Sequence, residues 1–400
     1  MKQGLLTLGL GVMLFSACHK QDAGCNQDNI ISDNVKFATQ QIGRQVSIIE
    51  EDSGKILNPR TIKCDKIKYV KIEDWTSGFF PGTMWYMYEL TRDEKWKNLG
   101  VKYTEDLDSV KYLTWHHDVG FMINSSYGNA YRITKNDAYK DVMVEAAKSL
   151  STRFRPIPGV IQSWDEDRGW QGKRGWMCPV IIDNMMNLEL LFEATRISGD
   201  SSFYQMAVSH ADVTLENHFR SDYSSYHVID YDKIKGGVRH KHTAQGYAHE
   251  SAWARGQAWA IYGFAVCYRE TKDPRYLTLT DNIYKYLFTH KNMPEDLVPY
   301  WDFDAPHIPN EPRDASAAAI IASALYELST FDRPEYKETA DKIIASLSSP
   351  AYRAILGTNG NFLLMHSVGS IPHGHEIDVP LNYADYYFLE ALLRKQTIEK

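Results

Sequence analysis

Two aspartates occupy segments in which a carboxylate could do chemistry. The first is Asp118, in WHHDVGFMINSSYGNAYRIT (Trp115–Thr134). It directly follows His116 and His117, so it could be a metal ligand beside them. It also precedes a helical pattern and could be the N-cap of that helix, or it could be a functional carboxylate. Adjacent side chains project in different directions, and the segment has no HxxxH or HExxH spacing. A metal site is therefore the least favoured interpretation, and the other two stay open.

The second aspartate is Asp183, in PVIIDNMMNLELLFEATRISGD. Pro179 suits a first helical turn, which predicts that Asp183 lies inside a helix. The same helix face would carry Met186, Asn187 and Leu190. An unpaired charge on an apolar face is costly, so this carboxyl group should bind a partner or take up a proton. Burial raises a carboxyl pKa, as a general acid requires near neutral pH. The alternative is a structural aspartate satisfied by its neighbours.

A third segment, KHTAQGYAHESAWARGQAWAIYGFA (Lys241–Ala265), combines polar loop residues with a helix. Arg255 and Trp259 are four residues apart and share one helix face. Arginine can hold a carboxylate through two hydrogen bonds, and an indole can stack on a sugar ring. Simple packing of Trp259 in the core is the competing interpretation, but the preceding His-, Thr- and Gln-containing loop favours a substrate pocket.

A repeated helix–turn–helix pattern indicates how these residues are positioned. Five times an apolar helical pattern ends in a short turn containing Asp, and an aromatic residue soon follows. The turns are Thr91–Asp93 before Trp96, Thr134–Asp137 before Tyr139, Ser198–Asp200 before Phe203, Thr271–Asp273 before Tyr276 and Thr330–Asp332 before Tyr336. Asp can cap the next helix, and the aromatic returns to the core one turn later.

These repeats predict successive helical hairpins. With a first helix over Ile30–Ile49 and a last over Leu381–Leu393, the pattern indicates an all-α fold, an (α/α)6 barrel formed as a six-hairpin toroid. An open superhelix of helical repeats is the competing architecture. In a closed barrel the inner helices bring their N-terminal ends and preceding loops to one mouth, where we expect the site.

The N-terminus has the pattern of an export signal. Lys2 is followed by an apolar run and then by Ser16-Ala17-Cys18, so residues 1–17 are predicted to be a signal peptide. Small residues before Cys18 predict a lipid anchor there, although an ordinary secretory signal is the alternative. Residues 18–33 would form a lipoprotein tether and residues 34–395 the catalytic domain. We expect an exported protein, either periplasmic or anchored to a bacterial membrane.

Composition argues against some partners. The net charge is −7, and no basic block appears, so nucleic acid is not an expected partner. The cysteines match no zinc motif.

The motifs together resemble those of a known family. HDVGFM, IIDNMMNLELLFEA and HESAWARGQAW, in this order and with WTSGFFPG upstream, resemble the unsaturated glucuronyl hydrolases of glycoside hydrolase family 88. The resemblance implies an (α/α)6 barrel, no metal and no cofactor. It also implies exo action on the 4,5-unsaturated uronic acid at the non-reducing end of lyase-generated glycosaminoglycan oligosaccharides.

The resemblance also implies roles for individual residues. Asp183 would be the general acid/base and Asp118 the second catalytic carboxylate. The implied substrate-binding residues are Thr243, Gln245, Arg255, Trp259, Trp75, Trp164 and His227. Ser367 and Ser370 could contact a sulfate or the substrate carboxylate. The two histidines before Asp118 are expected behind the site or at the surface.

The implied chemistry is hydration of an enol ether. Protonation of C4 makes C5 cationic, water adds there, and the resulting hemiketal opens and releases the next sugar. Ala244 has no charged group for a sulfate, so chondroitin, hyaluronan and heparin fragments all remain candidate substrates. The alternatives are a retaining glycosidase mechanism, an unsaturated rhamnogalacturonyl hydrolase acting on pectin fragments, and a non-catalytic glycan-binding lipoprotein.

Overall fold

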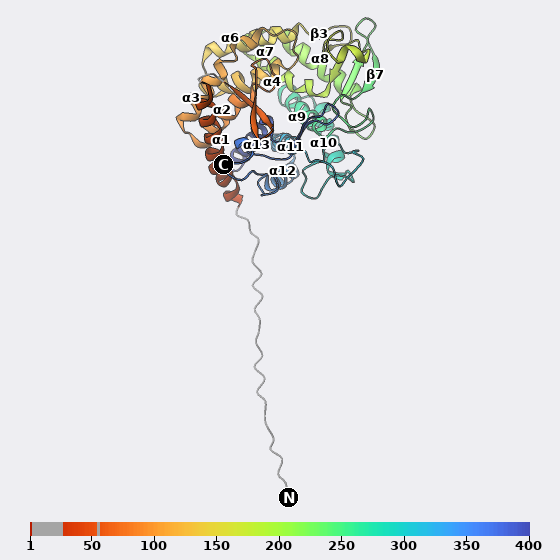
Figure 1. Cartoon of the computed structure of the whole chain (residues 1–400). Coiled ribbons are helices and arrows are strands. Elements are labelled where there is room, and N and C mark those ends of the chain that lie inside the picture. The colour runs from red at the N-terminus through yellow and green to blue at the C-terminus, as the bar shows by residue number, and fades with distance from the viewer. Residues whose placement is uncertain (2–26, 54–56) are drawn as a thin grey trace.

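The computed structural model describes Met1 and residues 27–53 and 57–400 (Figure 1). The predicted signal peptide, the lipid attachment at Cys18 and most of the predicted tether therefore lie outside the described residues. The first helix, α1, spans Gln27–Ser53. Residues 27–33, which we assigned to the tether, are thus helical, and the domain boundary predicted after residue 33 falls inside α1.

Within the described residues, twelve helical segments alternate between an inner and an outer ring. The inner ring contains α2 (Phe79–Thr91), α4 (Val119–Ile123) continued through η2 (Asn124–Gly128) and α5 (Asn129–Thr134), η4 (Ile182–Asn187) continued by α7 (Leu188–Ser198), α9 (Ala254–Thr271), α11 (Ala315–Ser329) and α13 (Asn382–Ile398). The outer ring contains α1, α3 (Glu94–Glu105), α6 (Asp137–Ser151), α8 (Ser201–Asn217), α10 (Pro274–Thr289) and α12 (Pro334–Leu347).

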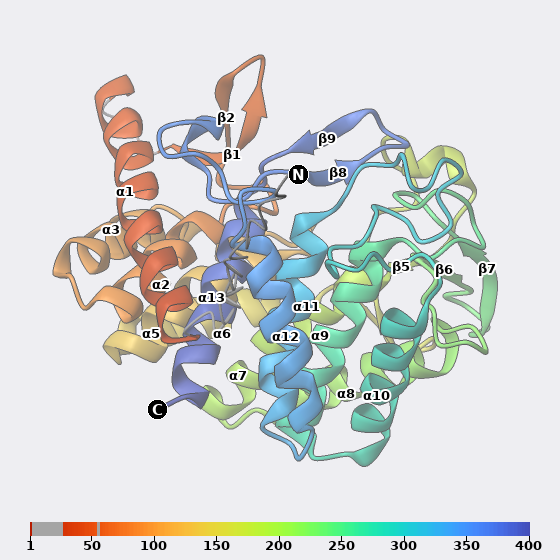
Figure 2. The same cartoon turned by 90° about the horizontal axis from the view of Figure 1, so that it is seen from below.

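The ring is closed because its last inner helix packs on its first. α13 lies between α11 and α2, and Figure 2 shows it among the inner helices. Across this junction Tyr86 Oη donates to Glu390 at 2.6 Å, and the rings of Phe79 and Tyr386 lie 5.1 Å apart. The fold is an (α/α)6 barrel, as predicted, and the open superhelix is excluded.

The polar turns between inner and outer helices are real, but only three are capped by the predicted aspartate. Asp93, Asp200 and Asp273 each accept a hydrogen bond from the backbone N–H two residues ahead. In the second turn Asn136 is the cap, since its side chain accepts from the N–H of Ala138 at 3.1 Å. The prediction is wrong for the last turn: Asp332 adopts a left-handed φ of 61°, and the following residue makes no side-chain cap.

The aromatic residues after these turns are all buried, as predicted. They are Trp96, Tyr139, Phe203, Tyr276 and Tyr336. Each fixes the start of an outer helix against the core, so the short turns and the aromatic anchors together set the alternation of rings.

The long loops from outer to inner helices carry short antiparallel strands. They are β1 (Asn58–Lys63) with β2 (Lys66–Val70), β3 (Phe154–Arg155) with β4 (Val160–Ile161), β5 (Pro179–Ile181) with β6 (Val228–Tyr231) and β7 (Val238–His242), and β8 (Ser367–Ser370) with β9 (His375–Val379). Pro179 thus begins a strand, and its prediction as a helix start is wrong. The reason is long-range pairing, because Val180 and Ile181 pair with β6.

No helix in the described part of the chain combines the length and apolar character needed to cross a membrane.

Candidate active site

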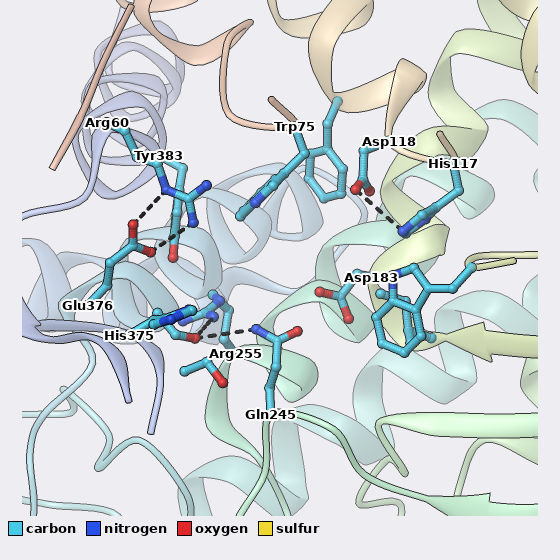
Figure 3. A pocket seen from close by; sticks show the side chains of 15 residues that line it. Arg60, Trp75, His117, Asp118, Asp183, Gln245, Arg255, His375, Glu376 and Tyr383 are labelled. Atoms are coloured by element: carbon cyan, nitrogen blue, oxygen red, sulfur yellow. Dashed lines mark hydrogen bonds and ion pairs between the residues drawn. The ribbon is translucent and has the colours of Figure 1, made fainter. Parts of the chain in front are cut away.

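A pocket opens where the inner helices begin (Figure 3). Trp75 precedes α2 and Asp118 precedes α4, while Asp183 lies in η4. Arg255 and Tyr383 are each the second residue of their helices, α9 and α13. The prediction that the inner helices bring their N-terminal ends to one mouth is therefore confirmed.

Asp118 occupies the N-cap position of α4, yet its side chain caps nothing in that helix. The carboxylate instead faces the two preceding histidines. Its Oδ2 lies 3.3 Å from His117 Nε2 and 3.6 Å from His116 Nδ1. Burial raises the pKa of Asp118 well above its usual range, and the charge of Asp183 raises it further. The simple N-cap interpretation is wrong, because the side chain turns into the pocket.

Asp183 is a buried carboxylate, one oxygen of which accepts no hydrogen bond from the described part of the chain. Among the described residues its Oδ2 has no hydrogen-bond partner, which does not fit a structural aspartate satisfied by its neighbours. Burial raises the pKa of Asp183 to about 7, against the lowering effects of the Arg255 charge and of its own backbone N–H. A carboxyl group with this pKa can exchange a proton near neutral pH.

His227 lies behind Asp183 and has a fixed tautomer. Its Nδ1 accepts hydrogen bonds from the backbone N–H groups of Ala244 and Gln245, at 3.0 and 3.1 Å. A neutral imidazole carries one hydrogen, which must then sit on Nε2. That atom lies 3.6 Å from Asp183 Oδ2. His227 therefore directs an N–H toward the carboxylate, at a distance longer than a hydrogen bond.

Arg255 is almost completely buried, at 1% exposure, beside the same pocket. Its Nη1 lies 3.0 Å from Asp314 Oδ2 and also donates to the Val368 carbonyl, and its Nη2 donates to the Gly369 carbonyl. The guanidinium therefore joins α9 to β8 and to the residue that caps α11, Asp314. This anchoring fixes a positive charge at the wall of the pocket.

Trp259, one turn after Arg255, is fully buried outside the pocket lining. Its ring packs against Phe121 and Tyr387 with centroids 5.1 and 5.6 Å apart. The structure thus favours a packing role for Trp259.

A metal is not supported by any clustering of ligands. Across residues 27–53 and 57–400, no three His, Cys, Asp or Glu side chains are grouped so that they could hold a metal ion.

Comparison with known protein families shows which family the chain belongs to. The family described as Glycosyl Hydrolase Family 88 matches residues 53–395. The chain belongs to glycoside hydrolase family 88. It is therefore an enzyme of the glycoside hydrolase class.

This family 88 hydrolase is similar in sequence to several named relatives. It is 46% identical over 375 residues to the unsaturated glucuronyl hydrolase of Formosa agariphila, covering 91% of this chain and 92% of the relative. It is 34% identical over 331 residues to the unsaturated chondroitin disaccharide hydrolase of Streptococcus agalactiae, covering 80% of this chain and 81% of the relative.

Solved structures show the same barrel. One is an unsaturated glucuronyl hydrolase specific for heparin, with a TM-score of 0.88, 44% identity and coverage of 93% of this chain and 98% of the other. Another is the unsaturated glucuronyl hydrolase of Bacillus sp. GL1, with a TM-score of 0.82, 28% identity and coverage of 92% and 97%.

The structure of the family 88 hydrolase brings most of the predicted residues together. Those that line the pocket are Asp118, Asp183, Trp75, Trp164, Gln245 and Arg255. The predicted contact residues Thr243, His227, Trp259 and Ser367 lie outside the lining. Thr243 instead accepts a hydrogen bond from the Gly246 N–H at 2.8 Å and so shapes the loop beside Gln245.

Two further predictions for this site need correction. Ser367 is fully buried at the start of β8, whereas Ser370 at the strand's end lines the pocket. His117 is not behind the site or at the surface, because it lines the pocket beside Asp118.

Several lining residues of the family 88 hydrolase were missed from the sequence. They are Arg60, Phe121, Ile181, Gly369, His375, Glu376 and Tyr383. Arg60 in β1 contacts Asp74 and, through Nη2, the Glu376 carboxylate of β9 at 2.8 Å, so the pair depends on a contact between distant hairpins. Tyr383 could have been found from the sequence, because it lies at the start of the predicted last helix, just as Arg255 lies at the start of its own helix.

Proposed function

We propose that this protein is an exo-acting unsaturated glucuronyl hydrolase. It removes the 4,5-unsaturated uronic acid from the non-reducing end of lyase-generated glycosaminoglycan oligosaccharides. The observation that carries the proposal is the pocket at the barrel mouth, in which Asp183 has a pKa of about 7 and an unpaired oxygen, and which Asp118 and Arg255 also line. The names of its relatives support the same reaction.

The geometry fits hydration with Asp183 as acid and then base. Protonated Asp183 gives its proton to C4 of the sugar, and the C4=C5 electron pair forms the new C–H bond. Water then bonds to the cationic C5 and returns a proton to Asp183. The hemiketal opens at its C5–O5 bond, leaving C1 as a hemiacetal that releases the next sugar. The Arg255 charge stabilises the intermediate carboxylate, and the His227 Nε2–H faces it.

Loss of the ultraviolet absorbance of the conjugated double bond tests the function directly. We would assay unsaturated disaccharides from chondroitin, hyaluronan, heparin and pectin, each in the presence of a chelator. Decay with one or more glycosaminoglycan disaccharides supports the proposal, and decay with the pectin disaccharide alone replaces it with rhamnogalacturonyl hydrolysis. Flat traces with binding retained would identify a glycan-binding protein instead.

The pH dependence of kcat/KM should follow Asp183. The group must be protonated to act as the acid, and burial raises its pKa to about 7. Above that pH its protonated fraction declines, so kcat/KM should fall by about tenfold per pH unit. Initial rates from pH 5 to 9, with circular dichroism as a control for unfolding, measure this. A value of kcat/KM that is constant to about two units above pH 7 would contradict the assignment.

We also propose that the enzyme is exported and anchored through a lipid on Cys18. The support is the apolar run followed by Ser16-Ala17-Cys18. Cys18→Ala should move the protein from the membrane fraction of expressing cells to the soluble periplasmic fraction, measured by immunoblotting. Equal distribution of wild type and variant would leave an ordinary secretory signal as the explanation.

A further inference from the structure

Two buried asparagines behind the pocket have orientations fixed by the backbone. The Phe121 N–H donates to Asn187 Oδ1 at 3.0 Å, so the Asn187 amide nitrogen points the other way. That nitrogen donates to Asn184 Oδ1 at 3.1 Å. Asn184 Nδ2 in turn donates to the Ile161 carbonyl at 2.6 Å. A backbone donor at one end and a backbone acceptor at the other leave one consistent orientation for both amides.

This orientation determines the tautomer of His117. Its Nδ1 lies 3.3 Å from Asn184 Oδ1, which can only accept, so Nδ1 must carry hydrogen. His117 is 3% exposed, and burial lowers its pKa well below the usual range, with His116 and Arg153 lowering it further. In the resulting neutral ring, Nε2 carries a lone pair.

That lone pair faces a carboxylate oxygen, since Nε2 lies 3.3 Å from Asp118 Oδ2 (Figure 3). Two lone pairs at this distance repel each other unless a proton lies between them. His116 does not supply one, because its Nδ1 accepts the Asp118 backbone N–H at 3.1 Å. Besides burial, the charges of Asp183 and Asp74 raise the pKa of the Asp118 carboxyl, whereas Asn187 and the Arg153 charge lower it.

We propose that Asp118 and His117 share one proton, which resides on Asp118 in the resting enzyme and moves to His117 during the reaction. Asp118 is then neutral when the substrate arrives and a carboxylate when positive charge develops. His117 acts as a positioning residue that sets the charge of Asp118. Asp183 differs because its histidine neighbour, His227, directs an N–H at it. The two carboxyl groups are thus distinguished by the tautomers of their histidines.

The catalytic role of this shared proton rests on the proposed function. Asp183 must be protonated to act as the acid, so an ionised Asp118 would be the negative charge that repels an anionic uronate, and a neutral Asp118 favours binding. When C5 becomes cationic, the proton moves from Asp118 Oδ2 to His117 Nε2, and the new carboxylate stabilises the cation. The proton returns once water has added and Asp183 has recovered its own proton, so the pair exchanges none with solvent.

Infrared difference spectroscopy of the free enzyme tests the shared proton without turnover. At pH 7, subtracting the Asp118→Asn spectrum from that of wild type should reveal the C=O stretch of a protonated carboxylic acid. His117→Gln should abolish this band, because its amide can donate to Asp118 in place of the lone pair. His218→Gln is the matched control, since His218 is also fully buried but does not line the pocket, and should retain the band.

The outcomes separate this proposal from the proposed function. If wild type shows only carboxylate bands relative to Asp118→Asn, the proton is not on Asp118 and the proposal is overturned. A band that survives unchanged in His117→Gln, with near-ultraviolet circular dichroism confirming its fold, overturns the role of His117. Neither result depends on activity. If the band behaves as expected, His117→Gln should also raise KM for an unsaturated disaccharide by about tenfold, which corresponds to 1.4 kcal/mol.

Discussion

Asp183→Asn should lower kcat/KM by about a thousandfold, because an amide cannot donate a proton to C4 or take one from water. KM should change by only a few-fold, since Asn keeps the size of the side chain and the pocket keeps Arg255 and Gln245. The rate of loss of ultraviolet absorbance, with a disaccharide that wild type consumes, measures both constants.

A control for Asp183→Asn comes from the outer ring. Asp341 on α12 pairs with Lys337 and Lys395, and it does not line the pocket. Asp341→Asn should reduce the melting temperature while leaving kcat/KM within about twofold of wild type. If Asp183→Asn retained a tenth or more of the wild-type rate, Asp183 could not be the proton donor.

Arg255→Met should destabilise the fold more than any surface charge change. Removing the guanidinium leaves Asp314, which is fully buried, and the carbonyls of Val368 and Gly369 without this partner. Breaking a buried ion pair from one side costs about 3–5 kcal/mol. The free energy of unfolding in urea measures the loss. KM should also rise strongly, because β8 and the positive wall of the pocket depend on the same group.

Two further substitutions distinguish geometry from charge at this position. Arg255→Lys keeps the charge but cannot reach all three acceptors, so it should recover only part of the stability. Arg333→Met removes another arginine held by a carboxylate through two bonds, to Asp281, but on partly exposed outer elements. Its cost should be about 1 kcal/mol or less. Equal losses for Arg255→Met and Arg333→Met would contradict the role assigned to Arg255.

The barrel and its two carboxylates could be predicted because their signals are local. Apolar periodicity and buried aromatics such as Trp96 and Tyr276 mark the hairpins, whatever the rest of the chain does. Pro179 was misassigned because a short apolar run fits a helix start and a buried strand equally well. Its pairing with β6 spans about fifty residues, and no local pattern reports that.

The remaining site residues were missed for the same physical reason, since their positions depend on contacts between distant segments. Arg60 and Glu376 are charged residues in short hairpins, where an exposed salt bridge is the ordinary expectation, and only the fold pairs them and places Arg60 over the ring of Trp75. The orientation of Asp118 also could not be predicted. An aspartate before a helix usually caps it, and here the carboxyl faces His117 instead.

Closure of the ring between α2 and α13 also determines when the enzyme can acquire its site during synthesis. Tyr86 and Tyr386, which meet across this junction, are 300 residues apart in the chain. The pocket needs Arg60 from the first hairpin and Tyr383 from the last helix. Such distant contacts form slowly, because the entropy of closing long loops is lost before they stabilise anything. A nascent chain still lacking α13 should therefore have assembled hairpins but no substrate pocket, so activity should appear only after the C-terminus has been released.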